Sequence, residues 1–189
     1  GIQSGYRVLG IDPAAGGDKS AVVLKSGNFQ QVLFNQQLQN TMDLVSVILD
    51  AYREWQCDMI VIDKTGVGQG VYDRLKQMDY PVKGISFGEK AEDEMFANMK
   101  AELHWKERKW ILSGGRLIQD YGWNEFEIVK YKNKDGKIAI QPKEELLREG
   151  IPSPNVVDAA VLTQFVGDSA IKSARILKTQ GNQFFDKTI

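Results

Sequence analysis

The segment that decides the fold begins with YRVLGID at residues 6–12 and continues with AVVLK at 21–25 and QVLF at 31–34. Each stretch is rich in aliphatic residues, and turns containing Gly, Asp, Ser and Asn separate them. This spacing predicts a β-meander of three antiparallel strands. A continuous apolar run, MIVI at residues 59–62, predicts a fourth strand, buried on both faces of a mixed sheet.

Helical patterns alternate with further strand patterns. Asn40 occupies the N-cap position of a helix whose apolar positions run through residues 44–55. A short helix over residues 71–78 is expected to lead into a strand over 82–87, and the longest helix is expected over 89–112. The pattern is that of one α/β domain without internal repeats.

The C-terminal part predicts a β-hairpin over residues 128–140, centred on NKDG at 133–136. A short helix is expected over residues 143–148. Ser153 followed by Pro154 then predicts a helix start, with Ser153 as N-cap, and this last helix is expected to reach about Phe165.

Composition limits the chemistry that this chain of 189 residues can perform. It has one cysteine, Cys57, and one histidine, His104, which excludes an internal disulfide and a Cys/His zinc site. We interpret Cys57 as a core residue and His104 as a helix-surface residue. Charge is nearly balanced, with 24 basic and 25 acidic side chains, and no apolar run approaches the ~20 residues of a membrane helix. Enzymatic chemistry would therefore depend on carboxylates, lysines or hydroxyls.

Three aspartates occupy positions where a carboxylate is costly. Asp12 and Asp63 directly follow the first and fourth predicted strands, and Asp158 lies in the second turn of an almost wholly apolar helix. Salt bridges or backbone caps are one explanation, and the strand-end positions suit that role. A shared Mg²⁺ or Mn²⁺ ion is the other, because hard cations prefer carboxylate oxygens. Two such ions about 4 Å apart can clamp the attacking and leaving oxygens of a phosphodiester displacement.

The same residues carry a resemblance to a known family. VLGIDPA at residues 8–14, followed by GDKSA at 17–21, resembles the opening of the nuclease domain of phage large terminase subunits. IDKTGVG at 62–68 resembles the second acidic strand of that family. Further matches in the same order are NMKAE at 98–102, KEEL at 143–146 and SPNVVDAA at 153–160. The resemblance spans roughly residues 6–165.

The family implies an RNase H-like fold, which is a five-stranded mixed sheet with three antiparallel strands first, flanked by helices. It also implies a metal-dependent endonuclease that cuts concatemeric double-stranded viral DNA during genome packaging and leaves 5′-phosphate and 3′-hydroxyl ends. One or two Mg²⁺ or Mn²⁺ ions would be its cofactors. Its partners would be an ATPase motor domain, a portal and a small terminase subunit in the host cytoplasm, with no membrane.

Carried over by position, the resemblance makes Asp12, Asp63 and Asp158 the metal ligands and the catalytic residues. Asp158 stands alone between Val157 and Ala159, whereas some relatives have an extra acidic residue beside it, so the second metal site is an open question. Secondary site candidates are Asp18, Lys64 and Glu102.

DNA binding would fall on basic segments near this acidic site. The stretch from residue 128 to 143 holds five lysines against one aspartate, which suits phosphate tracking, although a solvated Lys-rich edge would look the same. The DNA-binding candidates are Lys100, Lys130, Lys132, Lys134, Lys137 and Lys143. A second basic cluster on the long helix, which includes Lys106 and Arg108, is better explained by an ordinary solvent face.

Other functions remain open at this stage. A Holliday-junction resolvase or an integrase would share the carboxylates but need another DNA shape. An actin-like ATPase lobe also opens with a strand ending near Gly-Ile-Asp, and a non-catalytic DNA-binding module would use the acidic residues only as caps. Neither GVGQG at 66–70 nor GDKS at 17–20 has the spacing of a phosphate-binding loop, so no ATP site is expected in this chain.

The expected organisation is an expression remnant at residues 1–5, an RNase H-like domain at 6–166 and a basic tail at 167–189.

Overall fold

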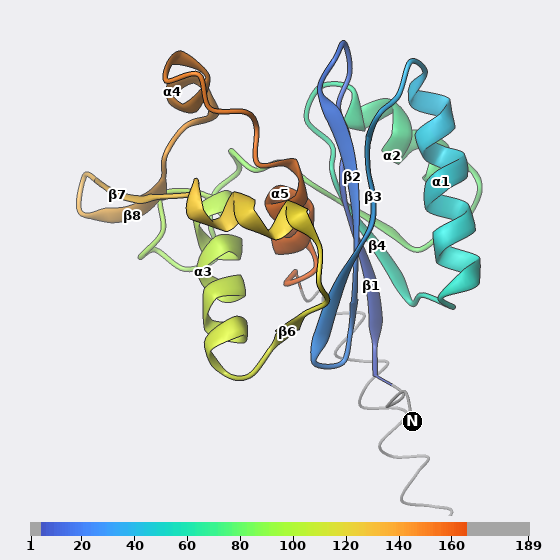
Figure 1. The fold of residues 1–189 in the computed structure, drawn as a ribbon, viewed down its shortest axis with the longest axis horizontal. Helices are drawn as coiled ribbons and strands as arrows, with labels where there is room; N and C mark the ends of the chain where they lie inside the picture. The colour runs from blue at the N-terminus through green and yellow to red at the C-terminus, as the bar shows by residue number, and fades with distance from the viewer. Residues whose placement is uncertain (1–4, 166–189) are drawn as a thin grey trace, which may run out of the picture.

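A mixed β-sheet with helices on both faces forms the computed structural model, which describes residues 5–165 (Figure 1). The strand order is β5-β4-β1-β2-β3-β6. Strands β1 to β3 form the expected antiparallel meander, and β4 and β5 continue the sheet in parallel. The bounds are β1 Arg7–Asp12, β2 Lys19–Ser26, β3 Phe29–Gln37, β4 Met59–Asp63, β5 Val82–Ile85 and β6 Arg116–Leu117. The α/β fold class is confirmed, and the two-residue strand β6 extends the five strands expected.

Helices cover the sheet in two layers. Helices α1 (Thr41–Glu54) and α2 (Gly68–Gln77) pack on one face, where they bury side chains such as Ile11 and Ile62. Helices α3 (Met99–Leu112) and α5 (Asn155–Leu162), with the 3₁₀ helix η1 (Tyr121–Glu127), cover the other face. Side chains such as Val8 and Val61 fill that second core. Cys57 is buried against the first layer, as expected.

Local capping explains where the helices begin. The Asn40 side chain accepts a hydrogen bond from the Met42 N–H at 2.9 Å, so its N-cap role is confirmed. Helix α3 begins at Met99, so the expected start at Glu89 was wrong, and with 14 residues it is as long as α1 and not longer. The Asn98 side chain caps α3 by accepting from Ala101 N–H at 3.0 Å, and the residues before it form a loop. The cap residue Asn98 therefore lies inside residues 89–112, which the spacing of apolar residues had predicted as one helix.

The start of α5 also differs from the expectation. Pro154 occupies the N-cap position, the first helical residue is Asn155 and the helix ends at Leu162. The predicted N-cap role of Ser153 was wrong, since its buried hydroxyl has no hydrogen-bond partner among the described residues. Asp158 therefore lies in the first turn of the helix and not in the second.

The predicted hairpin is confirmed and stands away from the sheet (Figure 1). It consists of β7 (Tyr131–Lys134) and β8 (Lys137–Ile140), and α4 (Lys143–Arg148) follows it. Asp135 and Gly136 form its turn at positive φ of 53° and 80°. The Ala97 N–H donates to the Ile138 carbonyl at 2.8 Å, which holds the hairpin against the loop before α3.

None of the helices within residues 5–165 is long and apolar enough to cross a membrane. The predicted remnant at residues 1–5 and the basic tail at 167–189 lie outside the described residues, apart from Gly5.

A buried polar network joins β3, α3 and the end of α5. Glu107, which has no exposed surface, accepts hydrogen bonds from Gln30 at 3.0 Å and from Gln164 at 2.6 Å. Burial raises the pKa of Glu107 to about 7, although these hydrogen bonds and the nearby Lys25 lower it. The protonated carboxyl is therefore the form that folding favours at mildly acidic pH.

We expect Glu107→Gln to flatten the dependence of stability on pH. Because the pKa of Glu107 is raised in the folded state, its contribution to stability is complete below its ordinary pKa of 4.5. That contribution is lost as the pH rises through about 7. The wild type should lose roughly 3 kcal/mol of unfolding free energy from this group over that interval. Urea unfolding at half-unit pH steps measures it, with exposed Glu54→Gln as the control, which should keep the slope of the wild type.

Candidate functional site

Strand alternation places Asp12 and Asp63 on the same face of the sheet. They end the neighbouring parallel strands β1 and β4, in which Ile11 pairs with Ile62. Val8 in β1 and Val61 in β4 point into the core under α3 and α5, and side chains two residues apart share a face. Both aspartates therefore lie at the carboxyl ends of adjacent strands, on the side that α5 covers.

Gly10 lets α5 approach that face. A Cβ atom at Gly10 would lie 1.9 Å from the Ala159 carbonyl oxygen, a distance that no side chain could tolerate. The backbone of α5 thus rests directly on β1, two residues before Asp12. Asp158 precedes Ala159 and is brought to the same end of the sheet.

The Asp158 carboxylate is buried, with 5% of the residue exposed, and α3 supplies both of its side-chain partners. Lys100 Nζ lies 2.8 Å from Oδ2, and His104 Nε2 lies 3.3 Å from Oδ1. His104 is itself only 4% exposed, so its predicted place on the helix surface was wrong. Lys100 and His104 are four residues apart on one helix, and this spacing turns both toward Asp158.

The pKa values of Asp12 and Asp158 are shifted in opposite directions. Burial raises the pKa of Asp12 well above its usual value, and the negative charges of Asp158 and Asp63 raise it further, against the lowering effect of Lys100 and Lys143. Burial would also raise the pKa of Asp158, but Lys100 and His104 outweigh it and hold this pKa below its ordinary value. Asp158 is therefore ionised and paired, whereas the surroundings of Asp12 favour its protonated form.

Burial also lowers the pKa of His104, against the raising effect of Asp158. The imidazole is thus neutral near pH 7. Because Nε2 faces a carboxylate, it carries the ring proton and donates a hydrogen bond to Asp158.

Glu125 caps the helix that carries Asp158. Its Oε2 accepts from the N–H groups of Val156 at 2.7 Å and Val157 at 3.1 Å, in place of the cap that Pro154 cannot supply. Burial raises the pKa of Glu125 to about 7, opposed by these two hydrogen bonds, and Asp158 adds to the increase. Sequence analysis missed both Glu125 and the Asp158 contact of His104, since both act across long sequence separations.

Asp18 joins the loop after β1 to the C-terminal segments. It accepts from Asn155 Nδ2 at 2.8 Å and pairs with Lys143 Nζ at 3.1 Å. Burial would raise the pKa of Asp18, but the hydrogen bonds from Asn155 and Lys143 lower it overall. Asp18 thus holds the start of α5 and places Lys143 near Asp12.

The other secondary candidates lie away from these carboxylates. Glu102 is buried and accepts from the N–H groups of Glu92 at 2.7 Å and Asp93 at 3.1 Å, so it fastens the loop before α3. Lys64 packs its side chain beside Gly84 of β5. Asp63 accepts from Thr65 N–H at 2.9 Å, a turn that fixes the end of β4.

Asp12, Asp63 and Asp158 offer the oxygen ligands that hard cations prefer, but they do not form a complete ligand set. Among residues 5–165, no group of three or more Asp, Glu, His or Cys side chains lies close enough together to hold a metal ion. The charge that raises the pKa of Asp12 nevertheless comes from Asp158 and Asp63. The charges of Asp158 and Asp63 thus act on Asp12, and those of Lys100 and Lys143 oppose them.

Solved structures with the same architecture are nuclease domains of phage large terminase subunits. The nuclease domain of gp2 from bacterial virus Sf6 has a TM-score of 0.76 and 19% sequence identity, over 87% of this chain and 90% of that one. The fold is that of these terminase nuclease domains. A mutant of the Sf6 domain with manganese and beta-thujaplicinol has a TM-score of 0.77 at 18% identity, over the same shares of both chains.

The nuclease of thermophilic phage G20c with bound magnesium has a TM-score of 0.66 at 14% identity, over 86% of this chain and 82% of that one. The expectation of a terminase-type RNase H-like fold is thereby confirmed. The sequence matches no protein-family model and none of the curated proteins.

We expect Glu125→Ala to destabilise the protein by about 1–3 kcal/mol, because two helix N–H groups lose their acceptor. Glu125→Gln keeps an amide oxygen in that position and should cost less than half as much. Guanidinium unfolding at pH 8 measures both. Equal losses in the two variants would contradict the capping role.

Proposed function

We propose that this chain is a metal-dependent endonuclease that cleaves double-stranded DNA. The observation that supports this most is the placement of Asp12 and Asp63 at the ends of adjacent strands, on the face of the sheet that α5 with Asp158 covers, in a fold shared with terminase nuclease domains. Under this proposal the three aspartates are the catalytic metal ligands. Relatives of this fold have been solved with manganese, magnesium and cobalt.

The donor chemistry fits Mg²⁺ or Mn²⁺. Asp12 and Asp63 supply carboxylate oxygens, and neither has an ion pair among the described residues. A bound divalent cation would supply a Lewis acid and lower the pKa of a nucleophilic water. Burial raises the pKa of Asp12 most, and the charges of Asp158 and Asp63 add to the increase, so a bound cation would favour its ionised form.

The remaining residues orient the ligands. His104 and Lys100 each hold one oxygen of Asp158, so its carboxylate plane is fixed by α3. Glu125 fixes the helix turn that carries it. Lys143, which pairs with Asp18 near Asp12, is placed to contact a DNA phosphate. Because Lys100 already pairs with one oxygen of Asp158, the number of bound metal ions, one or two, is a quantity to measure.

DNA would run across the basic hairpin. Lys134 and Lys137 are exposed near its turn, and Lys130 is also exposed. Lys132 pairs with Glu145 of α4, so it contributes less free charge than its neighbours. Lys100 is directed to Asp158, so it acts in the carboxylate region and not on the outer DNA track.

The biological setting follows from the resemblance. We propose cleavage of concatemeric viral DNA during packaging in the host cytoplasm, with an ATPase motor domain, a portal and a small terminase subunit as partners. A second candidate is a DNA-binding module without cleavage. The absence of a closed ligand set within residues 5–165 favours it, as does the Lys100 ion pair.

Plasmid cleavage in the presence of Mn²⁺ or Mg²⁺ decides between these candidates. We expect nicked and linear products that EDTA abolishes, with Asp63→Asn at least about 100-fold slower because a Lewis-acid contribution of several kcal/mol is lost. Asp63 is the more informative choice, since Asp158→Ala also removes the ion-pair partner of the partly buried Lys100. Exposed Asp50→Asn on α1 is the control and should cut at the wild-type rate.

Millimolar Mn²⁺ should also raise the melting temperature of the wild type and leave that of Asp63→Asn nearly unchanged. DNA binding with no metal-dependent cleavage would support the non-catalytic module. Faster cutting of four-way junctions than of linear duplex would instead indicate a resolvase.

We expect Lys134→Gln with Lys137→Gln to weaken DNA binding and to reduce the salt dependence of the binding constant. Each lost phosphate contact should lower the slope of log K against log salt by about 0.9. Arg74→Gln with Lys76→Gln on α2 removes the same charge from the opposite layer and is the matched control. Equal slopes for the two double variants would show that the hairpin is only a solvated edge.

A further inference from the structure

A buried carboxyl group outside the proposed catalytic site is the centre of a polar network between α3 and the sheet. Glu107 of α3 has no exposed surface, and its Oε2 accepts from Gln30 Nε2 of β3 at 3.0 Å and from Gln164 Nε2 at 2.6 Å. Gln164 Oε1 accepts in turn from Lys25 Nζ of β2 at 2.5 Å. Gln30 Nε2 also donates to Thr163 Oγ1 at 2.9 Å. The network therefore connects β2, β3 and α3 to the residues directly after α5.

The side chains of Gln30 and Glu107 each keep one oxygen without a partner. Gln30 Oε1 and Glu107 Oε1 are both buried, and neither has a hydrogen-bond partner among residues 5–165. Buried acceptors are usually paired, because water cannot replace the lost hydrogen bond. Two unpaired oxygens on side chains that already contact each other can be satisfied by a single donor between them.

The other contacts of Gln30 fix the orientation of its amide. The Thr163 hydroxyl donates to the Ala160 carbonyl at 2.7 Å, so its oxygen can only accept from Gln30. A reversed amide would turn its oxygen toward the Thr163 oxygen and the Glu107 carboxylate, which are both acceptors there. Gln30 Oε1 therefore needs a donor, and the carboxyl group that Gln30 already contacts becomes one when it binds a proton.

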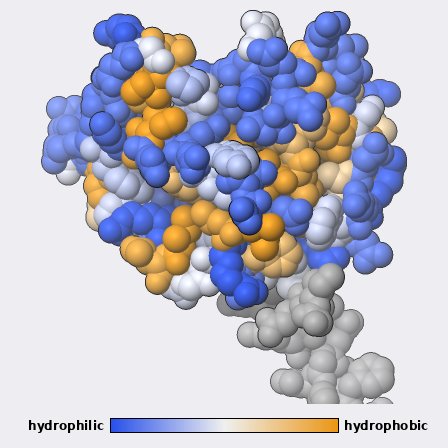
Figure 2. Space-filling view, viewed as in Figure 1, coloured by the Kyte–Doolittle hydropathy of each residue, from blue (hydrophilic) through white to orange (hydrophobic). Residues whose placement is uncertain are grey.

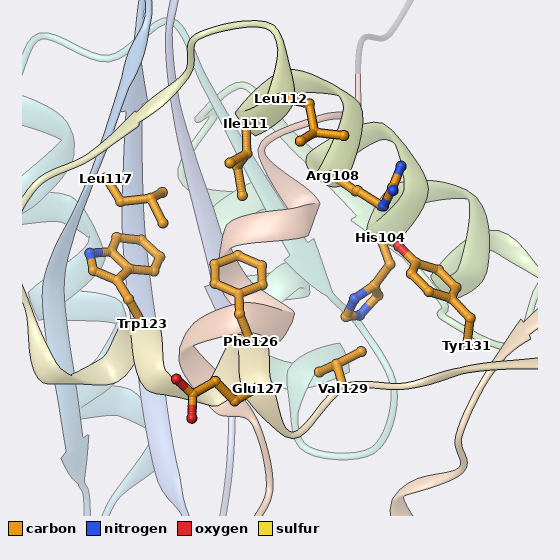
Figure 3. A pocket seen from close by; sticks show the side chains of 10 residues that line it. All are labelled: His104, Arg108, Ile111, Leu112, Leu117, Trp123, Phe126, Glu127, Val129 and Tyr131. Atoms are coloured by element: carbon orange, nitrogen blue, oxygen red, sulfur yellow. The ribbon is translucent and has the colours of Figure 1, made fainter.

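An aromatic cavity borders α3 next to this network. The cavity has a volume of about 430 Å³ and lies between α3, β6, η1 and β7, with Trp123 and Phe126 in its walls (Figure 3). Arg108 of α3 lines it, whereas the neighbouring Glu107 does not. Figure 2 shows apolar side chains on the lower part of the face, where Figure 1 places the end of α3 and β6. Because Glu107 has no exposed surface, a negative charge on it would lack solvation by water.

We propose that Glu107 is protonated in the folded protein and forms an acid–amide pair with Gln30. In this pair Glu107 Oε1–H donates to Gln30 Oε1, and Gln30 Nε2 donates to Glu107 Oε2, as it does in the structure. A carboxylic acid and a primary amide are complementary in this arrangement, since each offers one donor and one acceptor. One proton thus satisfies both unpaired oxygens, and its loss would leave two acceptors against each other. The pair is therefore a pH-sensitive connection between β3 and α3.

The charges around Glu107 agree with a neutral carboxyl below about pH 7. Burial raises the pKa of Glu107 to about 7, whereas its two amide hydrogen bonds and the charge of Lys25 lower it. Lys25 Nζ lies 4.9 Å from the centroid of the Trp110 ring and donates to Gln164. Among the described residues Lys25 forms no ion pair with Glu107. The acid–amide pair is thus formed below about pH 7 and lost above it.

Other titratable groups lie on the elements around α3. Strand β3 carries no charged side chain. Burial raises the pKa of Tyr131 of β7, the charge of Arg108 lowers it, and the charge of Glu107 adds to the increase. Arg116 of β6 is exposed, and Asp158 of α5 has its own partners on α3. None of these groups offers Glu107 an ion pair within the part of the chain that the structure describes.

The acid–amide pair holds the end of α5. Gln164 donates to Glu107, and Thr163 accepts from Gln30, so both residues depend on the geometry of the pair. Their backbone N–H groups donate to carbonyl groups of α5 at 3.0 Å. Ionisation of Glu107 should therefore loosen this end of the helix, an effect separate from the proposed cleavage of DNA.

Carbon-13 NMR of the full chain, labelled at Cδ of Glu and Gln, tests the protonation directly. The Glu107 signal should have the shift of a protonated carboxyl at about pH 5.5, where exposed Glu carboxyls are mostly ionised. It should titrate with a midpoint of about 7. The Gln30 Cδ signal should move with the same midpoint, because its oxygen then loses its donor. Glu107→Gln and Gln30→Met assign the two signals.

Hydrogen exchange measures the effect on α5. The protection factors of the Thr163 and Gln164 amides should fall at least about fivefold between about pH 6 and pH 8 in the wild type, because a buried hydrogen bond is lost. Glu107→Gln keeps a donor and an acceptor at every pH, so its protection factors should stay constant over that range. Exposed Glu54→Gln on α1 is the matched control and should show the fall of the wild type.

An ionised Glu107 at about pH 5.5, or a Glu107 titration that leaves the Gln30 signal unmoved, would overturn the proposal. Equal pH dependence of protection in the wild type and Glu107→Gln would also contradict it. The wild-type titration is decisive even if neither variant folds, since through-bond NMR experiments assign both signals.

Discussion

The close contact between Gly10 of β1 and the Ala159 carbonyl of α5 is the constraint on which the rest of the structure depends. Any side chain at residue 10 would push α5 off the sheet. That shift would carry Asp158 away from Asp12 and would break the two hydrogen bonds from α5 to Glu125. The second core layer, in which Val157 and Val161 pack on Val8 and Val61, depends on the same approach.

The three aspartates at this end of the sheet differ in whether they have a charged partner. Asp158 is buried and satisfied by Lys100 and His104, so it costs little to keep ionised. Asp12 and Asp63 lie at the strand ends without an ion pair of their own among the described residues, and the proposed cation would bind there.

His104 lies between this region and the aromatic cavity under α3. Its Nε2 lies 3.3 Å from Asp158, and the residue also lines the cavity. The only histidine of the chain therefore has a structural reason to be where it is, although catalysis by Mg²⁺ or Mn²⁺ would not require histidine.

Local patterns were reliable where a single segment carried the information. The meander, the Asn40 cap, the 128–140 hairpin and the strands that end at Asp12 and Asp63 all depend on neighbours in sequence. The start of α3 was predicted ten residues too early, because apolar spacing continues through the loop before Asn98. The cap of α5 was assigned to Ser153, whereas the acceptor is Glu125, about thirty residues earlier.

The sequence by itself determined the α/β class and the exclusion of an internal disulfide and a Cys/His zinc site, and it singled out the three aspartates as candidate metal ligands. Strand alternation and turn residues act over a few positions, so they can be read directly. Only the tertiary structure decided that Lys100 and His104 hold Asp158, that Glu125 caps its helix and that an aromatic cavity lies behind it. Those contacts join residues 31 to 58 positions apart, and their geometry exists only once α3, η1 and α5 have packed on the sheet.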